Sequence, residues 1–416
     1  MDHRATDSEI VVFWDKPENL SGEVTYTATI THNGAEVSSR RVNRTHCEFE
    51  GLKADSEYGI EVKLESGECL GSIKARTGRV KRVIDITKAP YNAIPDGKTV
   101  NTASIQKALD DCDGDSLVYI PSGTFLTGAL DIHSDSELLL EEGALLQGTS
   151  DPADYLPLIK SRFEGYERQC YRSLINLGTL DHDAGFNCEN VVIRGKGKIY
   201  GGGFDLAKRE AAEEEVRIRE FLAKLGDRIK EYENPTTPAF RVRGRLINMS
   251  NCKNIWIHGL DMGFGPSWNI HFVYSDTIVT DACTVRSGGV WNGDGWDPDS
   301  SVNCTLFNCV FFTEDDCVAV KSGKNPEGNI VNRPSKNIRV FDCETKFGHG
   351  LCIGSEMSGG VEDVKIWDCK MGPTWSGIEI KATRKRGGYV KNISVRDTVT
   401  SHVMVHIVGF NDDGEG

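Results

Sequence analysis

Hydrophobic and polar residues alternate in short runs along most of the chain, as half-buried β-strands require. Over residues 1–78 the runs EIVVFW, VTYTATITH and SEYGIEVKL are separated by turn residues about every ten positions. This rhythm predicts a small antiparallel β-sandwich. Beyond it, the segment TASIQKALDDC has helical spacing, and short strands broken by Gly, Ser and Asp follow.

A seven-residue pattern recurs in the second part of the chain, where one polar residue leads into alternating apolar positions. The pattern begins at Asn190, Asn254, Thr277, Asn303, Asn337, Asp363 and Asn392. After the first interval its copies are 23 to 34 residues apart. A unit of that length cannot bury its own apolar face, but stacked units can. We therefore predict an all-β fold with a parallel β-helix over residues 79–416 and the sandwich over 1–78, and we expect the leading Asn and Asp residues to stack at one corner.

Two irregularities interrupt this pattern. The first interval is longer than the others because it contains a segment rich in Glu, Arg and Lys, residues 204–233, which we predict to be a helical insertion. The chain also stops at VGFNDDGEG directly after an apolar strand. Because solenoids normally need a capping unit, we expect terminal coils to be missing.

Composition narrows the classes of partner. The formal net charge of −14 argues against nucleic acid as the main partner. No run of eighteen apolar residues exists, and the first residues lack a signal-peptide pattern, so we expect a cytoplasmic protein that does not span a membrane. A secreted or periplasmic protein whose leader was removed is the alternative. The thirteen cysteines show no zinc spacing and are interpreted as buried free thiols.

The candidate chemistry lies in residues that stacking would bring together. Asp315 and Asp316 in TEDDCVAVKSG, His349 in FGHGL, Asp294 in WNGDGW and Lys381 in IEIKAT each follow the first strand of their own coil. Equivalent positions in neighbouring coils are about 4.8 Å apart. These five residues are therefore predicted to form one stripe on a facet of the solenoid.

Crowded carboxylates suit acid–base hydrolysis of a glycosidic bond. One carboxyl with a raised pKa can donate a proton, while an ionised neighbour activates water. If the two come from different coils, their separation fits the roughly 6.5–9.5 Å that accompanies inversion at the anomeric carbon. Metal ligation by the clustered aspartates is an alternative, whereas a serine nucleophile lacks its GxSxG motif.

Four ordered blocks resemble glycoside hydrolase family 28, the polygalacturonases, whose motifs are N-x-D-G, D-D-C-x-x-x-K-S-G, G-H-G and R-I-K. This chain has NGDG at 292–295, DDCVAVKSG at 315–323, GHG at 348–350 and EIK at 379–381. The resemblance covers about residues 83–416 and implies a right-handed parallel β-helix. Separately, Trp14 and Tyr58 make residues 1–78 similar to a fibronectin type III domain, to which we assign no chemistry.

The family resemblance implies a role for each matching residue. Asp315 would be the general acid, Asp294 and Asp316 would hold and activate the water, and His349 would support the protonation of the acid. The residues expected to contact or shape the substrate site are Asn292, His271, Lys381, Glu379, Arg384 and Arg386. Glu379 is a departure, because the family has Arg there and uses it with the Lys to hold a uronate carboxylate; Arg384 or Arg386 could neutralise Glu379 or bind the uronate instead.

The predicted function is that of an inverting glycoside hydrolase acting on pectic poly- or oligosaccharide. The expected linkage is α-galacturonosidic, with attack at the chain end because the long insertions could close one end of the groove. No cofactor and no metal are expected, and the oligomeric state is left open. Because of Glu379, a rhamnogalacturonan or substituted-pectin hydrolase is an alternative. A β-helical polysaccharide lyase and a non-catalytic carbohydrate-binding protein are further alternatives.

Overall fold

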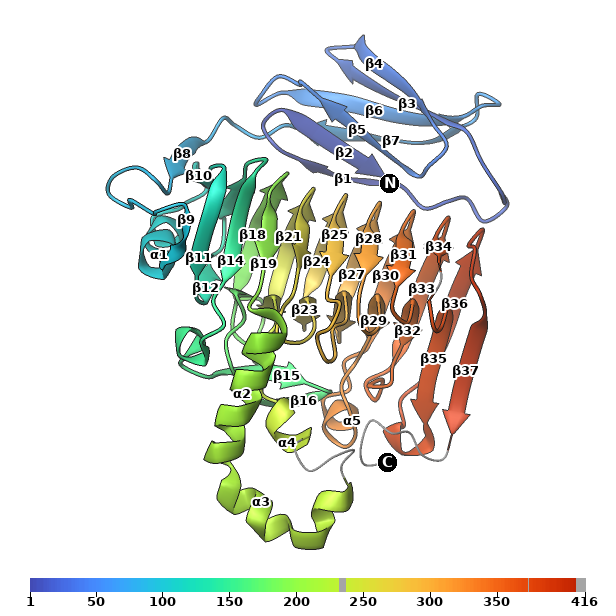
Figure 1. Ribbon diagram of the computed structural model, residues 1–416. Helices are drawn as coiled ribbons and strands as arrows, with labels where there is room; N and C mark the ends of the chain where they lie inside the picture. Colours follow the sequence, from blue (N-terminus) through green and yellow to red (C-terminus); the bar gives the residue numbers. More distant parts are fainter. Residues whose placement is uncertain (232–236, 373, 409–416) are drawn as a thin grey trace.

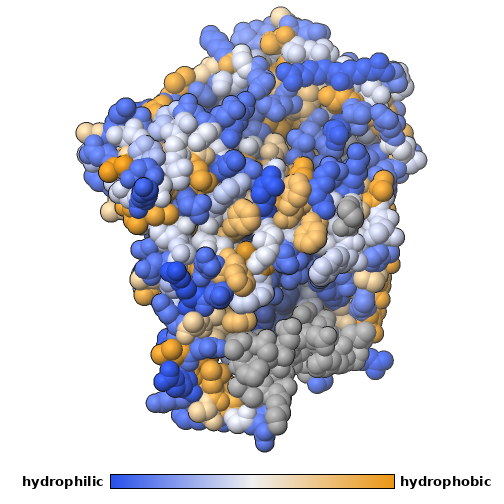
Figure 2. All heavy atoms as spheres, viewed as in Figure 1, coloured by the Kyte–Doolittle hydropathy of each residue, from blue (hydrophilic) through white to orange (hydrophobic). Residues whose placement is uncertain are grey.

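The computed structural model describes residues 1–231, 237–372 and 374–408, and it has two parts (Figure 1). A small antiparallel β-sandwich, drawn in blue, lies along one side of a long stack of parallel strands. Figure 2 shows hydrophilic residues over most of this face, with hydrophobic residues scattered among them. In the described part of the chain, no helix is both long and apolar enough to cross a membrane.

The sandwich consists of two sheets that enclose their own core. One sheet contains β1 (Asp2–Ala5), β2 (Glu9–Phe13) and β5 (His46–Glu50). The other, in the order β4–β3–β6–β7, contains β3 (Tyr26–His32), β4 (Ala35–Val42), β6 (Glu57–Leu64) and β7 (Cys69–Arg76). Trp14 packs edge-on against Tyr26 between the sheets. A sandwich is therefore present as predicted, and its fibronectin type III identity stays a prediction.

The rest of the chain is a parallel β-helix, which confirms the predicted fold class. Successive coils add one strand to each of three sheets in turn, and the strands of each sheet are paired in parallel. The first sheet contains β8 (Arg82–Asp85), β10 (Ser116–Ile120), β13 (Glu137–Leu140), β18 (Cys188–Gly195), β21 (Cys252–His258), β24 (Asp276–Asp281), β27 (Val302–Phe307), β30 (Ser335–Phe341), β33 (Val361–Trp367) and β36 (Val390–Arg396).

The second and third sheets have shorter strands. The second contains β9 (Asp96–Val100), β11 (Gly123–Thr127), β14 (Ala144–Gly148), β19 (Lys198–Tyr200), β22 (Asp261–Gly263), β25 (Thr284–Arg286), β28 (Val310–Phe312), β31 (Glu344–Phe347) and β34 (Lys370–Met371). The third contains β12 (Leu130–Ile132), β17 (Ile175–Leu177), β20 (Ile247–Ser250), β23 (Ile270–Val273), β26 (Trp296–Asp299), β29 (Val318–Val320), β32 (Leu351–Ile353), β35 (Ile378–Thr383) and β37 (Val403–Val408).

The recurrent polar residues stack at a corner of the first sheet, as predicted. Asn254 donates a side-chain hydrogen bond of 2.8 Å to Asn190 in the preceding coil, and Asn337 donates one of 2.7 Å to Asn303. All four have a positive φ, which Asn tolerates better than most residues. The cysteines are free, and all except Cys69 and Cys112 are buried, so they behave as small hydrophobic residues.

Helices and one hairpin surround one end of the third sheet (Figure 1). The hairpin is β15 (Ile159–Phe163) with β16 (Tyr166–Cys170). The predicted insertion is helical as expected, with α2 (Gly203–Arg217), α3 (Arg219–Leu225) and a 3₁₀ turn over Gly226–Glu231; residues 232 and 233 lie outside the described residues. The remaining elements are α1 (Thr102–Asp110), α4 (Thr237–Phe240), α5 (Glu327–Val331) and 3₁₀ turns at Pro152–Tyr155 and Arg384–Arg386.

The sandwich is packed firmly on the outer face of the first sheet. Val11 and Phe13 on β2 contact a row of aromatic and apolar side chains from successive coils, which comprises Trp256, Val279, Phe307, Phe341 and Trp367. Buried Lys16 forms ion pairs with Asp368 at 2.7 Å and Asp397 at 2.8 Å. Because each side supplies both apolar and charged partners, the sandwich and the β-helix form one body.

The last described strand, β37, leaves apolar side chains exposed. Val403, Val405 and Ile407 are 59%, 61% and 73% accessible to solvent. They alternate along the strand with Met404 and His406, whose side chains point to the opposite face. The expectation of further terminal coils stays a prediction.

Candidate active site

Strand register in the third sheet brings three of the predicted residues into one column. Trp296, Val318 and Leu351 begin β26, β29 and β32 and are paired with one another across the coils. Two residues before each of them stand Asp294, Asp316 and His349, respectively. Neighbouring coils are separated by about 4.8 Å, so these turn residues lie one above another.

Asp316 is the most tightly held member of the column. The Lys381 ammonium lies 2.9 Å and 3.1 Å from its two carboxylate oxygens. His349 Nδ1 lies 3.4 Å from its Oδ1, and the Cys352 thiol donates a hydrogen bond of 2.9 Å to the same oxygen. Burial alone would raise the pKa of Asp316, but Lys381, His349 and Lys321 together hold it well below its usual range.

Lys381 reaches this position from a different row. It is the fourth residue of β35, so its backbone lies farther along the strand than the turn residues. Side chains on β35 alternate, and those of Glu379 and Lys381 both point out of the coil. The long Lys381 side chain extends back to Asp316, so its ammonium group joins the predicted stripe although its backbone does not.

Asp315 has the opposite environment. Its side chain is 32% exposed, against 3% for Asp316, and it lies 3.5 Å from His349 Nδ1. Burial and the neighbouring negative charge of Asp316 raise the pKa of Asp315. Asp316 and Asp315 in turn raise the pKa of His349. The site thus contains one carboxyl that favours the protonated form beside one that favours the ionised form.

Asp294 belongs to a buried charge cluster directly beside this pair. The Lys321 ammonium lies 3.3 Å from Asp294 and 3.3 Å from Glu356. Asp297 is buried next to Asp294, and its oxygens have no hydrogen-bond partner among the described residues. Burial and the mutual repulsion of the carboxyls raise the pKa values of Asp294 and Asp297, and Lys321 favours the ionised form of Asp294.

Two predicted substrate residues, Asn292 and His271, lie on the N-terminal side of the column and make internal contacts, and their substrate roles stay predictions. Asn292 accepts a hydrogen bond of 2.5 Å from Arg243, which fixes the turn before Asp294. His271 is fully buried, lies 3.4 Å from Asp299, and has its pKa lowered to about 4 by burial.

On the C-terminal side, the structure places the remaining predicted residues in two separate regions. The Glu379 side chain is largely buried, 3.4 Å from His406 Nε2 and 4.0 Å from the Cys352 sulfur. Arg384 is exposed in the turn after β35, five residues beyond Glu379 in the sequence. Arg386 is buried in that turn and donates a hydrogen bond of 2.8 Å to Asn325.

Several site residues were not predicted from the sequence, namely Lys321, Glu356, Asp297, Cys352 and Trp375. Lys321 had a usable signal, because in VAVK the alternation of β29 points Ala319 and Lys321 outward. Trp375 also had a usable signal in the sequence. Val318, Leu351 and Ile378 are paired across the coils, and the residues three positions before them are Asp315, Gly348 and Trp375. Its ring is 67% exposed and lies 5.2 Å from the His349 ring.

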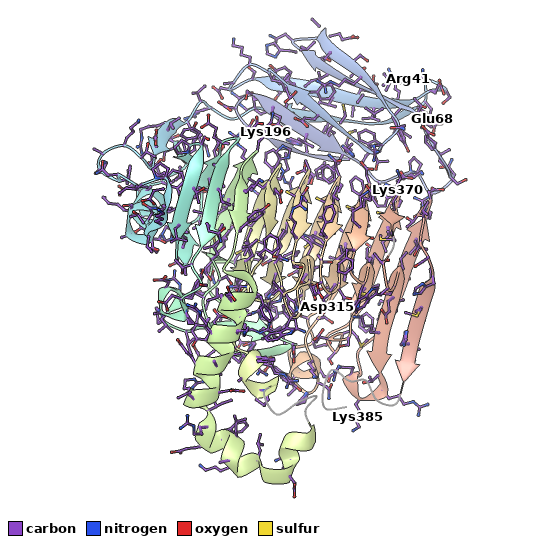
Figure 3. The ribbon with its side chains drawn as sticks, in the orientation of Figure 1. Arg41, Glu68, Lys196, Asp315, Lys370 and Lys385 are labelled. Atoms are coloured by element: carbon purple, nitrogen blue, oxygen red, sulfur yellow. The ribbon has the colours of Figure 1, made fainter. Side chains whose placement is uncertain are left out.

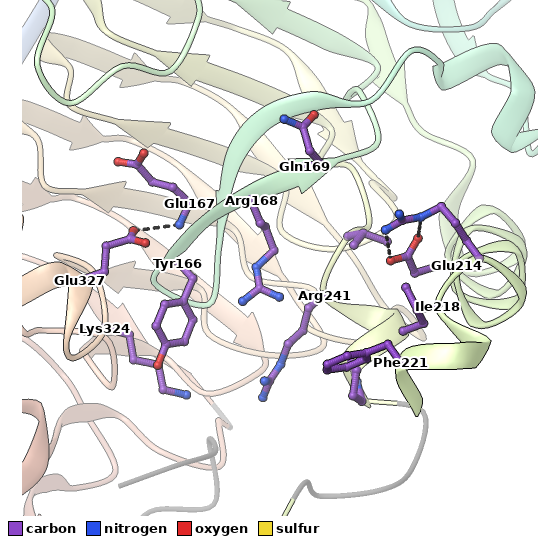
Figure 4. Close-up of a pocket in the computed structure, with 13 residues that line it drawn as sticks. Tyr166, Glu167, Arg168, Gln169, Glu214, Ile218, Phe221, Arg241, Lys324 and Glu327 are labelled. Carbon is purple, nitrogen blue, oxygen red and sulfur yellow. Dashed lines mark hydrogen bonds and ion pairs between the residues drawn. The ribbon is translucent and has the colours of Figure 1, made fainter. Parts of the chain in front are cut away.

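A pocket of about 580 Å³, lined by basic and acidic side chains, opens among the hairpin β15–β16, the insertion and α5 (Figure 4). Arg168 and Arg241 point into the same space, with Tyr166 and Lys324 on one side and Phe221 on the other. Burial and Arg386 lower the pKa of Lys324 to about 8. Lys324 follows Lys321 by three residues, so the pocket adjoins the charge cluster around Asp294.

Two groups of side chains have the geometry to hold a cation. Asp315, Asp316 and His349 place one ligand atom each within 4.8 Å of one another, as do Glu9, Glu48 and His258 at the sandwich interface. In the first group Lys381 already supplies positive charge to Asp316. The arrangement therefore supports acid–base chemistry by its own residues.

Comparison with known proteins decides the family. The sequence profile described as Glycosyl hydrolases family 28 matches residues 184–409, more than half of the chain. The chain belongs to this family. The prediction from the four motifs is thereby confirmed, and the matched segment contains the column of Asp294, Asp316 and His349 as well as Lys381.

Two curated relatives are similar over most of the chain. A probable polygalacturonase of Vitis vinifera is 31% identical over 361 residues, which are 80% of this chain and 65% of the relative. An exo-poly-alpha-D-galacturonosidase of Dickeya chrysanthemi is 26% identical over 454 aligned positions, covering 97% of this chain and 74% of the relative. The chain thus spans about two thirds of the length of the grapevine protein.

Solved structures share the fold. The family 28 exopolygalacturonase of Yersinia enterocolitica has a TM-score of 0.82 at 23% identity, and the alignment covers 97% of this chain and 80% of that one. A hyperthermoactive exopolygalacturonase of Thermotoga maritima has a TM-score of 0.68 at 28% identity, with 80% and 77% covered. The first match extends over the sandwich as well as the β-helix.

Proposed function

We propose that this protein hydrolyses α-galacturonosidic linkages in pectic poly- or oligosaccharides, with inversion and from the chain end. The observation that carries the proposal is the opposite environment of Asp315 and Asp316. Adjacent carboxyls with pKa values displaced in opposite directions supply an acid and a base at the same pH.

The residues divide the hydrolytic step between them. Asp315 donates its proton to the glycosidic oxygen as the bond from the anomeric carbon to that oxygen breaks. Asp316 and Asp294 hold a water molecule, and Asp316 accepts its proton as the water oxygen bonds to the anomeric carbon from the opposite face. The products are a new reducing end and a free hydroxyl. Asp294 and Asp315 come from different coils, which supports a separation that leaves room for water and hence inversion.

Chain-end attack is supported by the hairpin β15–β16 and the helical insertion, which enclose the pocket of Figure 4. Arg168 carries a guanidinium group that suits a uronate carboxylate, whereas the Arg241 guanidinium is ion-paired with Glu164 at 2.6 Å. The Dickeya relative and both solved neighbours are described as exo-acting, which agrees with this proposal.

The test is product analysis with reduced oligosaccharides that contain galacturonate. Expected results are a single short product from the earliest time points and an initial product of inverted anomeric configuration by proton NMR. The Asp315→Asn variant should release product about 10² to 10⁴ times more slowly while keeping the melting temperature of the wild type. Wild-type turnover by that variant would overturn the assignment, and unsaturated products absorbing in the ultraviolet would indicate a lyase instead.

A further inference from the structure

Three metal-ligating side chains meet where the sandwich packs on the first sheet of the β-helix (Figure 1). Glu9 on β2 lies in the row of Val11 and Phe13, whose side chains contact that sheet. Glu48 on β5 is paired with Val11 and faces the same way. Opposite the two glutamates, His258 ends β21 and points out of the coil. One ligand atom from each of the three lies within 4.8 Å of the others.

The His258 ring is oriented as a metal-binding imidazole usually is. Its Nδ1 lies 2.9 Å from one carboxylate oxygen of Asp281, the paired residue in the next coil. Asp281 is buried, and its other oxygen accepts a hydrogen bond of 2.7 Å from Trp256 Nε1. A metal-ligating His almost always donates its second ring N–H to such a carboxylate, which fixes the tautomer. The ring therefore presents Nε2 to Glu9, whose Oε1 lies 3.4 Å away.

The carboxylates around His258 lack a permanent cation. Within residues 1–231, 237–372 and 374–408, no lysine or arginine forms an ion pair with Glu9, Glu48 or Asp281. Glu9 Oε1 is buried and accepts no hydrogen bond from the described residues. Glu50, paired with Glu9 across the strands, adds a further negative charge. Because carboxylates removed from water are costly without a compensating charge, this arrangement favours a bound cation.

The geometry and the ligand types suit zinc. Zinc binds imidazole nitrogen and carboxylate oxygen at about 2.0–2.2 Å in a tetrahedron, so two of its ligand atoms are about 3.3–3.6 Å apart. The distance from His258 Nε2 to Glu9 Oε1 is 3.4 Å. A cavity of about 430 Å³ between the sandwich and the β-helix is lined by Glu48 and Asp281, which gives an entry path and room for a water as fourth ligand. Calcium and magnesium prefer oxygen ligands alone.

We propose that Glu9, Glu48 and His258 Nε2 bind a zinc ion that bridges the sandwich and the β-helix. Without the ion, a proton on Nε2 supplies the positive charge, and zinc binding releases that proton. Since the ligands come from both parts of the chain, the ion binds only where the two are packed together and stabilises that packing. This interface zinc site is separate from the catalytic column, because Figure 3 shows Asp315 well away from the sandwich.

The experiment titrates ZnCl₂ into the full chain after a chelator has removed bound metals, and follows binding by calorimetry and stability by thermal unfolding. The wild type should melt at a higher temperature in ZnCl₂ than in chelator, whereas MgCl₂ should leave the melting temperature unchanged. Asp281→Asn should weaken zinc binding about 10- to 100-fold because the imidazole loses its orienting carboxylate. His258→Gln and Glu48→Gln each remove a ligand and should weaken zinc binding at least as much.

Controls identify which residues hold the ion. Glu68→Gln removes an exposed carboxylate of the sandwich (Figure 3) and should keep the zinc affinity of the wild type. Asp316→Asn removes a member of the other group that has the geometry to hold a cation, and it should also keep that affinity. Zinc binding that is lost in Asp316→Asn and retained in Glu48→Gln would place the ion in the catalytic column and overturn the interface zinc site. Equal melting temperatures of the wild type in ZnCl₂ and in chelator would overturn it too, whatever its activity on pectic substrates.

Discussion

Replacement of Lys381 tests whether this lysine keeps Asp316 ionised. In Lys381→Met, the ammonium that lies 2.9 Å from Asp316 is lost, and an apolar side chain of similar length takes its place. Two unit charges about 3 Å apart interact by about 5 kcal/mol at an effective dielectric constant of about 20. This corresponds to an upper limit of about four pKa units. Because His349 and Lys321 still stabilise the carboxylate, we expect the pKa of Asp316 to rise by roughly one to three units.

The direction of the effect on activity follows from the role of Asp316 as a base. The base is competent above its pKa, so a raised pKa moves the acidic limb of the kcat/KM profile to higher pH. The assay is kcat/KM for a galacturonate-containing oligosaccharide from about pH 3 to 8 for the wild type, Lys381→Met and Lys381→Arg. Lys381→Arg keeps the charge and should keep the limb near its original position.

A matched control is Lys385→Met, which removes an exposed lysine in the turn after β35 and should leave the profile unchanged. Thermal unfolding of each variant checks that the site is intact. If the acidic limb of Lys381→Met coincides with that of the wild type, then Lys381 does not set the protonation of Asp316, and the electrostatic argument for the base fails.

Three further changes test the acid, the domain interface and a half-buried histidine. Asp315→Asn should lower kcat by about 10² to 10⁴ without a change in melting temperature, because the proton donor is lost; a loss confined to KM would contradict this. Phe13→Ala should lower the free energy of urea unfolding by about 3–5 kcal/mol, because the Phe13 ring packs 5.1 Å from the Phe307 ring. An unfolding curve with the midpoint and slope of the wild type would contradict a rigid interface between the sandwich and the β-helix. Burial alone would lower the pKa of His258, but Asp281 helps to raise it to about 9. The protonated His258 therefore stabilises the folded protein fully below about pH 6.5, and this contribution disappears as the pH rises through 9. Unfolding free energies between pH 6 and 10 should show this decline, of up to about 3 kcal/mol, in the wild type and a much smaller one in Asp281→Asn.

The β-helix could be predicted because its sequence signal repeats. Each coil must turn at the same corner, so Asn254 and Asn337 recur there and satisfy one another across coils. The hairpin β15–β16 could not be predicted in this way. It occurs once, outside the repeat, and its antiparallel pairing depends on contacts with α5 such as the hydrogen bond from Glu167 N to Glu327.

The active-site column was predictable to the extent that it follows backbone register. Asp294, Asp316 and His349 occupy equivalent positions, and counting from each repeat brings them near one another. Lys381 occupies another row, and its contact with Asp316 depends on the reach of a long side chain. For the same reason the approach of Lys321 to Asp294 was not foreseen.

The adjacency of Asp315 and Asp316 shows where prediction from the sequence has its physical limit. Two neighbouring residues of one type have the same intrinsic pKa, and nothing in TEDDCVAV distinguishes them. The turn before β29 leaves one side chain partly exposed and points the other into contact with His349, Cys352 and Lys381, which come from two later coils. The difference between acid and base is therefore a property of the stacked coils. It follows that substitutions in those later coils should exchange or equalise the two pKa values while leaving both aspartates and their own turn untouched.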